Sequence, residues 1–219
     1  MNYMNKHTSP IHLLRVVFSL ILVMSISVDI GAQNTQRSSL EKVIRSLKEG
    51  GFILFMRHPQ TNHDQADTDP LNLSNITNQR QLTDEGRQTA IQMGKAFKSL
   101  KIPFGTIISS RFNRAQETAQ LLNLGEVKTS LEVTEGGLVV SPFENARRAT
   151  ALKKVLSTPP SKGTNILIIS HKQNLQDAAG KEFADLEEGE VVVFYPDGQG
   201  SFKAIARVND PRLWDRNVR

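Results

Sequence analysis

Two histidines and two arginines are the residues of this 219-residue chain best suited to chemistry by their type and position. Arg57 and His58 follow one short apolar run, Arg111 follows a second, and His171 follows a third. An imidazole nitrogen is a nucleophile, and the planar guanidinium of an arginine binds oxyanions through several N–H groups at once. The pattern therefore indicates a pocket for a phosphate-like dianion with a nucleophile beside it.

The apolar runs predict the strands that would position these residues. The predicted strands are Phe52–Met56, Phe104–Ser109, Asn165–Ser170, Glu190–Tyr195 and Ser201–Val208. Helical spacing predicts helices near 40–49, 83–100, 113–123, 144–157 and 174–180 between them. This alternation predicts an α/β fold: a mostly parallel sheet covered on both faces, with an antiparallel edge hairpin. Ligands of such sheets bind at the carboxyl ends of the strands, where the four residues are expected to meet.

The composition excludes several kinds of protein. There is no cysteine, which excludes a thiol nucleophile, a thiolate metal site, a disulfide scaffold and a lipoprotein anchor. The net charge is +5, from 27 Lys and Arg against 22 Asp and Glu, but the basic residues are scattered. Few aromatic residues are present to stack on bases, and an anionic small substrate explains the charge as well. We therefore expect no nucleic-acid binding.

The amino-terminal segment is typical of a secretory signal peptide. Lys6 and Arg15 precede the apolar run Val16–Met24, and the small residue Ala32 precedes a polar segment. We expect residues 1–32 to be the signal peptide and 33–219 to be a single domain, located in the periplasm or secreted. The apolar run is short for a spanning helix. No stable membrane insertion is therefore expected after cleavage, although an uncleaved anchor is the alternative.

Four motifs in order resemble those of the histidine phosphatase (phosphoglycerate mutase-like) superfamily, in particular its small exported bacterial members. An Arg-His signature lies in Phe55–Thr61, a Leu-Thr-x-x-Gly-x-x-x-Ala element in Leu82–Ala90, a Ser-Ser-x-x-x-Arg-Ala-x-x-Thr-Ala element in Ser109–Ala119, and a late strand ending in histidine in Ile166–His171. The motifs extend over most of residues 33–219, which makes the resemblance far more specific than any one of them.

The resemblance implies a three-layer α/β/α sandwich and a phosphohistidine intermediate. In this scheme His58 is the nucleophile and His171 donates to the phosphoryl oxygens. Arg57 and Arg111 bind the same oxygens, so that Arg57, Arg111 and His171 form the phosphate-binding set. Four such donors make a metal ion unnecessary, and we expect neither a metal nor another cofactor.

Two further arginines are candidates for an additional cation at the site. Either Arg80 or Arg114 could supply it, but Arg114 fits an exposed position on its helix equally well. The acidic residues of the long loop 60–81 lack the spacing of a calcium-binding loop, and we interpret them as solvated.

The general acid that protonates the leaving group is less clearly marked than the nucleophile. Glu135 has the spacing from the middle arginine that the resemblance implies, and it is the preferred candidate. Glu132, Glu188 and Glu190 are alternatives that the sequence leaves open. The residue after His171 is Lys172, so the aspartate found there in the acid-phosphatase branch of the superfamily is missing.

The sequence therefore predicts a metal-independent phosphomonoester hydrolase that acts on a small phosphorylated substrate. Two alternatives remain: a phosphohistidine-protein phosphatase, and an inactive phosphate-binding protein with the same fold. Specificity is expected to come from the loop Gln60–Gln81 and from the segment after Leu131. The sequence carries no indication of the oligomeric state.

Overall fold

The computed structural model describes residues 39–136, 139–209, 212 and 214. The chain divides into two compact units, residues 1–42 and 43–219, and the second contains the whole sheet. The predicted signal peptide, residues 1–32, lies outside the described residues. Within the described residues, no helix is long and apolar enough to cross a membrane.

A six-stranded mixed sheet forms the centre of this unit, in the order β3-β2-β4-β1-β5-β6. The strands are β1 (Ile53–Arg57), β2 (Phe104–Ser110), β3 (Val127–Ser130), β4 (Asn165–Ser170), β5 (Val191–Pro196) and β6 (Phe202–Val208). The first four are parallel, whereas β5 pairs antiparallel with β1 and β6 antiparallel with β5. The predicted α/β class, with a mostly parallel sheet and an antiparallel edge hairpin, is confirmed.

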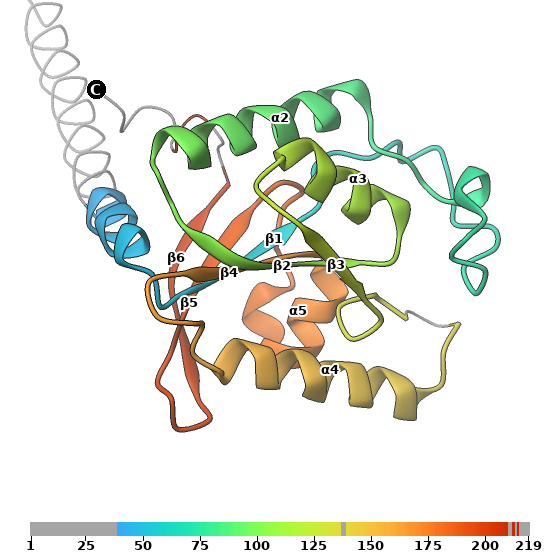
Figure 1. Ribbon diagram of the computed structural model, residues 1–219. Coiled ribbons are helices and arrows are strands. Elements are labelled where there is room, and N and C mark those ends of the chain that lie inside the picture. The colour runs from blue at the N-terminus through green and yellow to red at the C-terminus, as the bar shows by residue number, and fades with distance from the viewer. Residues whose placement is uncertain (1–38, 137–138, 210–211, 213, 215–219) are drawn as a thin grey trace, which may run out of the picture. The chain divides into compact units, whose positions relative to one another are not determined.

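Helices cover both faces of the sheet, which gives three layers (Figure 1). The helices are α2 (Asp84–Ser99), α3 (Asn113–Leu122), α4 (Pro142–Ser157) and α5 (Lys172–Ala179), with short 3-10 helices η1 (Ile76–Asn78) and η2 (Lys181–Phe183). Helices α2 and α3 pack together on one face, and α4 and α5 pack together on the other. Residues 39–49 are also helical, and Gly50 and Gly51, both with positive φ, follow them.

Strands β1 and β4 lie side by side in the middle of the sheet and are almost completely buried. Apolar side chains from both strands point into the two helix layers, which explains why both read as continuous apolar runs in the sequence. Each buried leucine, isoleucine or phenylalanine contributes about 1.5–3 kcal/mol to folding. The carboxyl ends of β1 and β4 are consequently held rigidly next to each other.

The first turn of α2 lies directly against the segment that follows β1. Thr83 caps the helix by accepting a hydrogen bond from the Gly86 amide at 3.0 Å. A Cβ atom on Gly86 would lie 2.1 Å from the Gln60 carbonyl oxygen. Only glycine permits this close approach, which gives a physical reason for the Leu-Thr-x-x-Gly motif.

Candidate active site

His58 and His171 meet at the carboxyl ends of the two central strands. The pairing of Arg57 with Ser170 and a backbone hydrogen bond from His58 N to the Ser170 carbonyl oxygen set their register. The two imidazole rings lie edge to face with their centroids 5.2 Å apart. Both residues are 1% exposed, so the structure places the two predicted histidines in one buried pair.

The ring of His58 is fixed with one nitrogen bound and the other available. Its Nδ1 lies 2.9 Å from the carbonyl oxygen of Pro59. A carbonyl oxygen can only accept a hydrogen bond, so Nδ1 carries the hydrogen and Nε2 carries the lone pair. Burial, together with the nearby charges of His171 and Arg114, lowers the pKa of His58 well below 6.5. The imidazole is therefore neutral at physiological pH and able to act as a nucleophile through Nε2.

His171 is held by β2 and presents its second nitrogen as a donor. Its Nε2 lies 2.7 Å from Ser110 Oγ. If the Ser110 hydroxyl donates to Nε2, then Nδ1 carries the hydrogen. This Nδ1–H group has no hydrogen-bond acceptor, and the nearest carboxylate oxygen, from Glu135, lies 3.5 Å away. Burial, followed by the charges of Arg114, Arg80 and Arg57, lowers the pKa of His171 well below 6.5.

Arg57 lies at the same edge, between the end of β1 and the segment before β5. Its Nη1 donates to the Leu186 carbonyl oxygen at 2.7 Å, and its Nη2 lies 3.4 Å from a Glu188 carboxylate oxygen. Burial lowers the pKa of Arg57, and the Glu188 carboxylate opposes this effect. The guanidinium thus keeps its charge beside the two histidines.

The arginine from α3 that reaches the histidines is Arg114, not Arg111. The side chain of Arg114 is fully buried, and its charge lowers the pKa values of both histidines. Arg111 is exposed and is not among the charges that act on either imidazole. Arg111, which we predicted to bind phosphate, precedes the helix and is exposed, whereas Arg114 lies on the buried face of α3 with Ala115 and Thr118.

Two carboxylates and an aromatic ring fix the guanidinium of Arg114. Its Nη1 is 3.0 Å from an oxygen of Asp67, in the long loop, and its Nη2 is 2.6 Å from an oxygen of Glu135. The central carbon of the guanidinium lies 4.3 Å from the ring centroid of Phe112. The alternative that Arg114 is a surface residue is wrong. The ion pairs with these two carboxylates compensate the buried charge of the guanidinium.

Three buried N–H donors at this edge have no hydrogen-bond partner. They are Arg80 Nε, Arg114 Nε and His171 Nδ1, and the fourth such side-chain atom in the described part of the chain, Trp214 Nε1, lies beside Phe97 instead. An unsatisfied buried donor costs about 1–3 kcal/mol, more when it is charged. An oxyanion has the acceptor atoms that three such donors need.

Among the four candidate acids, the structure brings two to the site. Glu135 contacts Arg114 and His171, and Glu188 contacts Arg57. Glu132 instead accepts from Ser130 and pairs with Arg147 on α4. Glu190 is buried and forms a two-point ion pair with Arg207 on β6. Neither Glu132 nor Glu190 is positioned to exchange a proton with a substrate.

The described residues contain no group of three or more histidine, cysteine, aspartate or glutamate side chains that could hold a metal ion. The donors around His58 are guanidinium and imidazole groups, which bind anions.

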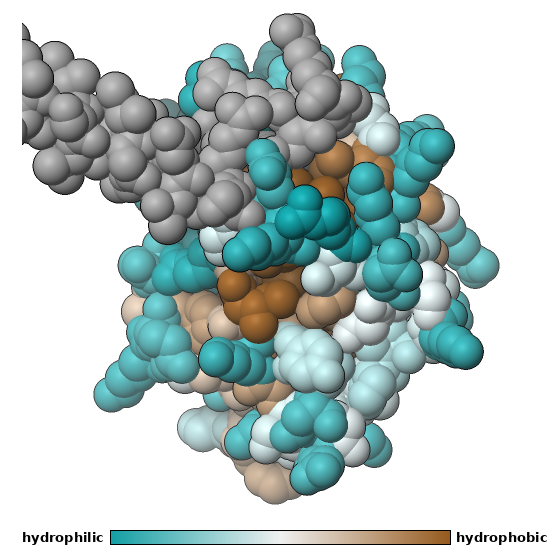
Figure 2. Space-filling model, turned by 90° about the vertical axis from the view of Figure 1, so that its left-hand side faces the viewer, coloured by the Kyte–Doolittle hydropathy of each residue, from teal (hydrophilic) through white to brown (hydrophobic). Residues whose placement is uncertain are grey.

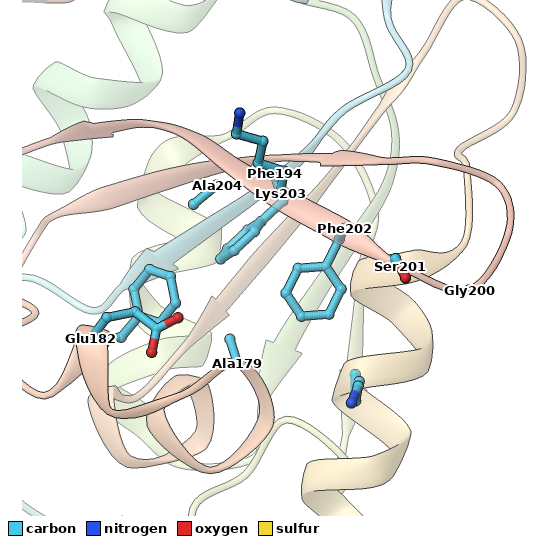
Figure 3. A pocket seen from close by; sticks show the side chains of 10 residues that line it. Ala179, Glu182, Phe194, Gly200, Ser201, Phe202, Lys203 and Ala204 are labelled. Carbon is cyan, nitrogen blue, oxygen red and sulfur yellow. The ribbon is translucent and has the colours of Figure 1, made fainter.

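A separate crevice of about 560 Å³ lies at the other end of the sheet (Figure 3). Phe183, Phe194 and Phe202 contribute most of its apolar lining, and Lys153 and Glu182 lie at its border. Phe194 pairs with Ile53, at the amino end of β1, so the crevice is remote from His58.

The left-hand side of Figure 1, seen face-on in Figure 2, is mostly hydrophilic around small hydrophobic areas. Neither feature contributes to the histidine site.

Residues 53–136 match the sequence model of the histidine phosphatase superfamily, branch 1. This part of the chain is similar to that superfamily. The matched region contains Arg57, His58 and Arg114 but ends before His171, which the sheet brings to the same edge. A comparison with curated protein sequences finds no match.

Several solved structures, two of them named as phosphatases, share the fold. The protein histidine phosphatase SixA, complexed with tungstate, is 17% identical with a TM-score of 0.54, covering 74% of this chain and 97% of that chain. A phosphoserine phosphatase mutant from Entamoeba histolytica, complexed with phosphoserine, is 17% identical with a TM-score of 0.51, covering 74% and 98%. Bacillus stearothermophilus YhfR is 18% identical with a TM-score of 0.51, covering 70% and 94%. At this level of identity the likenesses show a shared fold, which covers nearly the whole of each of these chains.

Proposed function

We propose that the protein is a phosphomonoester hydrolase that acts through a phosphohistidine intermediate on His58. The observation that carries this proposal is the neutral, oriented imidazole of His58 next to three unpartnered buried N–H donors. A phosphoryl group placed against these donors would present its phosphorus to Nε2 of His58. The match of residues 53–136 to the histidine phosphatase model supports the same chemistry.

The reaction divides into two displacements. Nε2 of His58 attacks phosphorus and the ester oxygen leaves, which forms the phosphohistidine. Water then attacks the same phosphorus, and phosphate is released while the imidazole returns to its neutral form. The hydrogen bond from Nδ1 to Pro59 persists throughout and stabilises the positive charge that develops on the ring.

Arg57, Arg114 and His171 bind the phosphoryl oxygens in this mechanism, and Arg80 adds a fourth donor. The charges of Arg57 and Arg114 lower the pKa values of both histidines, and the charge of Arg80 lowers the pKa of His171, which places these arginines within electrostatic reach of the site. Fixed donors of this kind stabilise the negative charge of the transition state, and each contributes on the order of 10²–10³ in rate.

The test is hydrolysis of an aryl phosphate by the purified protein, with and without a chelator. We expect turnover that does not depend on added metal and that is lost in His58→Ala. Thermal melting of the variant serves as the control for folding. Binding of phosphate without turnover in the native protein would contradict the proposal and support an inactive phosphate-binding protein.

The same assay also tests the alternative that the protein is a phosphohistidine-protein phosphatase. A phosphorylated histidine peptide is offered to the protein next to the phosphate ester. Faster release of phosphate from the peptide than from any phosphate ester would contradict an ester hydrolase and favour that alternative.

We further propose that the protein is exported to the periplasm or secreted, as a member of a small exported branch of the superfamily. The support is the sequence of residues 1–32, in which charged residues precede the apolar run Val16–Met24 and a small residue precedes a polar segment. Amino-terminal sequencing of the protein from fractionated cells tests this. A mature chain that begins near Gln33 is expected, and an intact amino terminus in the cytoplasmic fraction would contradict it.

A further inference from the structure

Two carboxylates border the histidine site, and each contacts an arginine of the proposed phosphate-binding set. Glu135 contacts Arg114 and His171, which belong to the phosphate-binding set. Glu188 contacts Arg57, Thr61 and His63, which lie at or just beyond the end of β1. We propose that Glu188 is the general acid and base of the reaction, an inference that rests on the proposed function of His58.

The backbone of the segment that carries Glu188 is hydrogen-bonded directly to the backbone of Arg57 and His58. The Gly189 amide lies 3.2 Å from the Arg57 carbonyl oxygen and 3.1 Å from the His58 carbonyl oxygen. Gly189 has φ +81°, a conformation that favours glycine and turns the chain next to His58. The residue before this glycine is therefore held beside the nucleophile by main-chain contacts, independently of its own side chain.

The side chain of Glu188 is then oriented by three neighbours. Its Oε1 accepts a hydrogen bond from Thr61 Oγ1 at 2.7 Å and lies 3.4 Å from Arg57 Nη2. Its Oε2 lies 3.3 Å from His63 Nε2. The Glu188 side chain is 14% exposed, so it is largely shielded from solvent but not sealed within the protein.

His63 connects this carboxylate to water. The side chain of His63 is 65% exposed, and an imidazole can take up a proton from solvent and pass it on. Glu135, whose side chain is 26% exposed, instead pairs with the fully buried guanidinium of Arg114 at 2.6 Å and lies 3.5 Å from His171. We therefore assign to Glu135 the fixation of Arg114 and to Glu188 the exchange of protons.

The proton transfers balance in both steps. As the bond between Nε2 of His58 and phosphorus forms and the ester P–O bond breaks, protonated Glu188 gives its proton to the leaving oxygen. In the second step the Glu188 carboxylate takes a proton from the attacking water as the oxygen–phosphorus bond forms and the nitrogen–phosphorus bond breaks. Glu188 is then protonated again, and one water has been consumed per ester hydrolysed.

The experiment compares two esters that differ in their need for an acid. An alkyl phosphate releases an alkoxide that must be protonated, whereas para-nitrophenyl phosphate releases a stable phenolate. Loss of each ester is followed in a single turnover with enzyme in excess, in the native protein, Glu188→Gln and Glu135→Gln. We expect Glu188→Gln to slow the alkyl ester by about 10²–10⁴-fold and the aryl ester by less than tenfold. Glu135→Gln is expected to slow both by the same factor.

A second readout follows the phosphoenzyme. Glu188→Gln lacks the base for the second step, so phosphohistidine formed from the aryl ester is expected to accumulate. Glu188→Asp, which retains a carboxylic acid, is expected to recover part of the alkyl ester rate. Equal loss on both esters in Glu188→Gln, or selective loss in Glu135→Gln, would overturn the assignment of Glu188. Absence of any phosphoenzyme in the native protein would instead contradict the proposed function itself.

Discussion

At the scale of single residues, the site combines several cations with two imidazoles that remain uncharged. Burial is the largest cause of the low pKa values of His58 and His171, and the neighbouring arginines lower them further. The same arginines attract a phosphate dianion. One set of charges thus keeps the nucleophile unprotonated and binds the group that it attacks.

Arg114 and Arg111 form a matched pair of variants. Arg114→Lys keeps one charge but loses the planar set of donors that its neighbours orient, so the rate of phosphate ester hydrolysis is expected to fall on the order of 10²-fold. Arg111→Lys changes an exposed side chain and is expected to keep the rate within about twofold. Steady-state kinetics on both variants checks this. A larger loss in Arg111→Lys would restore Arg111 as the phosphate-binding residue.

The buried histidines also predict how stability depends on pH. Both pKa values are lowered on folding, so below about pH 6.5 the unfolded chain binds protons that the folded chain does not. The free energy of unfolding is therefore expected to decrease as the pH falls below this value, by at most about 1.4 kcal/mol per pH unit for each histidine. Urea unfolding across this range measures the slope. The double variant His58→Gln, His171→Gln should lose most of it, and an unchanged slope would contradict the pKa directions.

The sequence predicts the two histidines and Arg57 well because each directly follows a strand whose end is fixed by an apolar run. Arg111 and Arg114 are only three positions apart, but the arginine of the Ser-Ser-x-x-x-Arg-Ala element is Arg114. The available signal was the spacing of Arg114 from Thr118, one helical turn later and also buried. The position of Glu188 depends on contacts with residues more than a hundred positions away in the sequence. Arg80 lies within an irregular segment. No local sequence pattern predicts either position.

At the scale of elements, the segment between α5 and β5 shapes one wall of the site. The Leu186 carbonyl oxygen accepts from Arg57, and Glu188 lies beside the same guanidinium. The segment is anchored by Arg207 on β6, which forms two hydrogen bonds with the buried carboxylate of Glu190, at 2.6 and 3.1 Å. The edge hairpin therefore supports the site although it contributes no residue to the phosphate-binding set.

This anchor predicts a loss of stability in Arg207→Ala. The Glu190 side chain is 4% exposed, so removal of Arg207 leaves a buried charge without its partner. We expect the free energy of unfolding to fall by about 2 kcal/mol. Chemical denaturation of the variant, with Lys203→Ala on the same strand as the control, measures the difference. A difference below about 0.5 kcal/mol would show that the anchor is unimportant.

The order of strands could not be predicted from the sequence, although the strands themselves were. Asn165–Ser170 was predicted with the bounds that β4 has, because both of its faces are buried and its pattern is strong. β3 was not among the five predicted strands, because it is short and its residues are half-buried or exposed. α5 begins at Lys172 rather than near 174, and α4 at Pro142 rather than 144, where the capping residue Ser141 starts the helix.

At the scale of the whole molecule, a net charge of +5 is spread over the chain, yet three arginines, Arg57, Arg80 and Arg114, are close enough to His171 to lower its pKa. An anion that binds there stabilises the folded state by mass action. At a phosphate concentration one hundred times the dissociation constant, the stabilisation is about 2.7 kcal/mol. For a chain of this size the melting temperature is expected to rise by roughly 5–10 °C.

Thermal melting with increasing phosphate or vanadate checks this expectation. Arg57→Ala should lose most of the increase, whereas Lys153→Ala, at the separate crevice, should retain it. An equal increase in both variants would show that the anion binds elsewhere.

The most direct test of the central claim is to identify the residue that receives the phosphoryl group. The protein is mixed briefly with a labelled aryl phosphate, quenched, digested and analysed by mass spectrometry. A phosphoryl group on His58, stable in alkali and labile in acid, is the result that the structure predicts. Turnover with no label on His58, or with the label on His171 or His63, would contradict it.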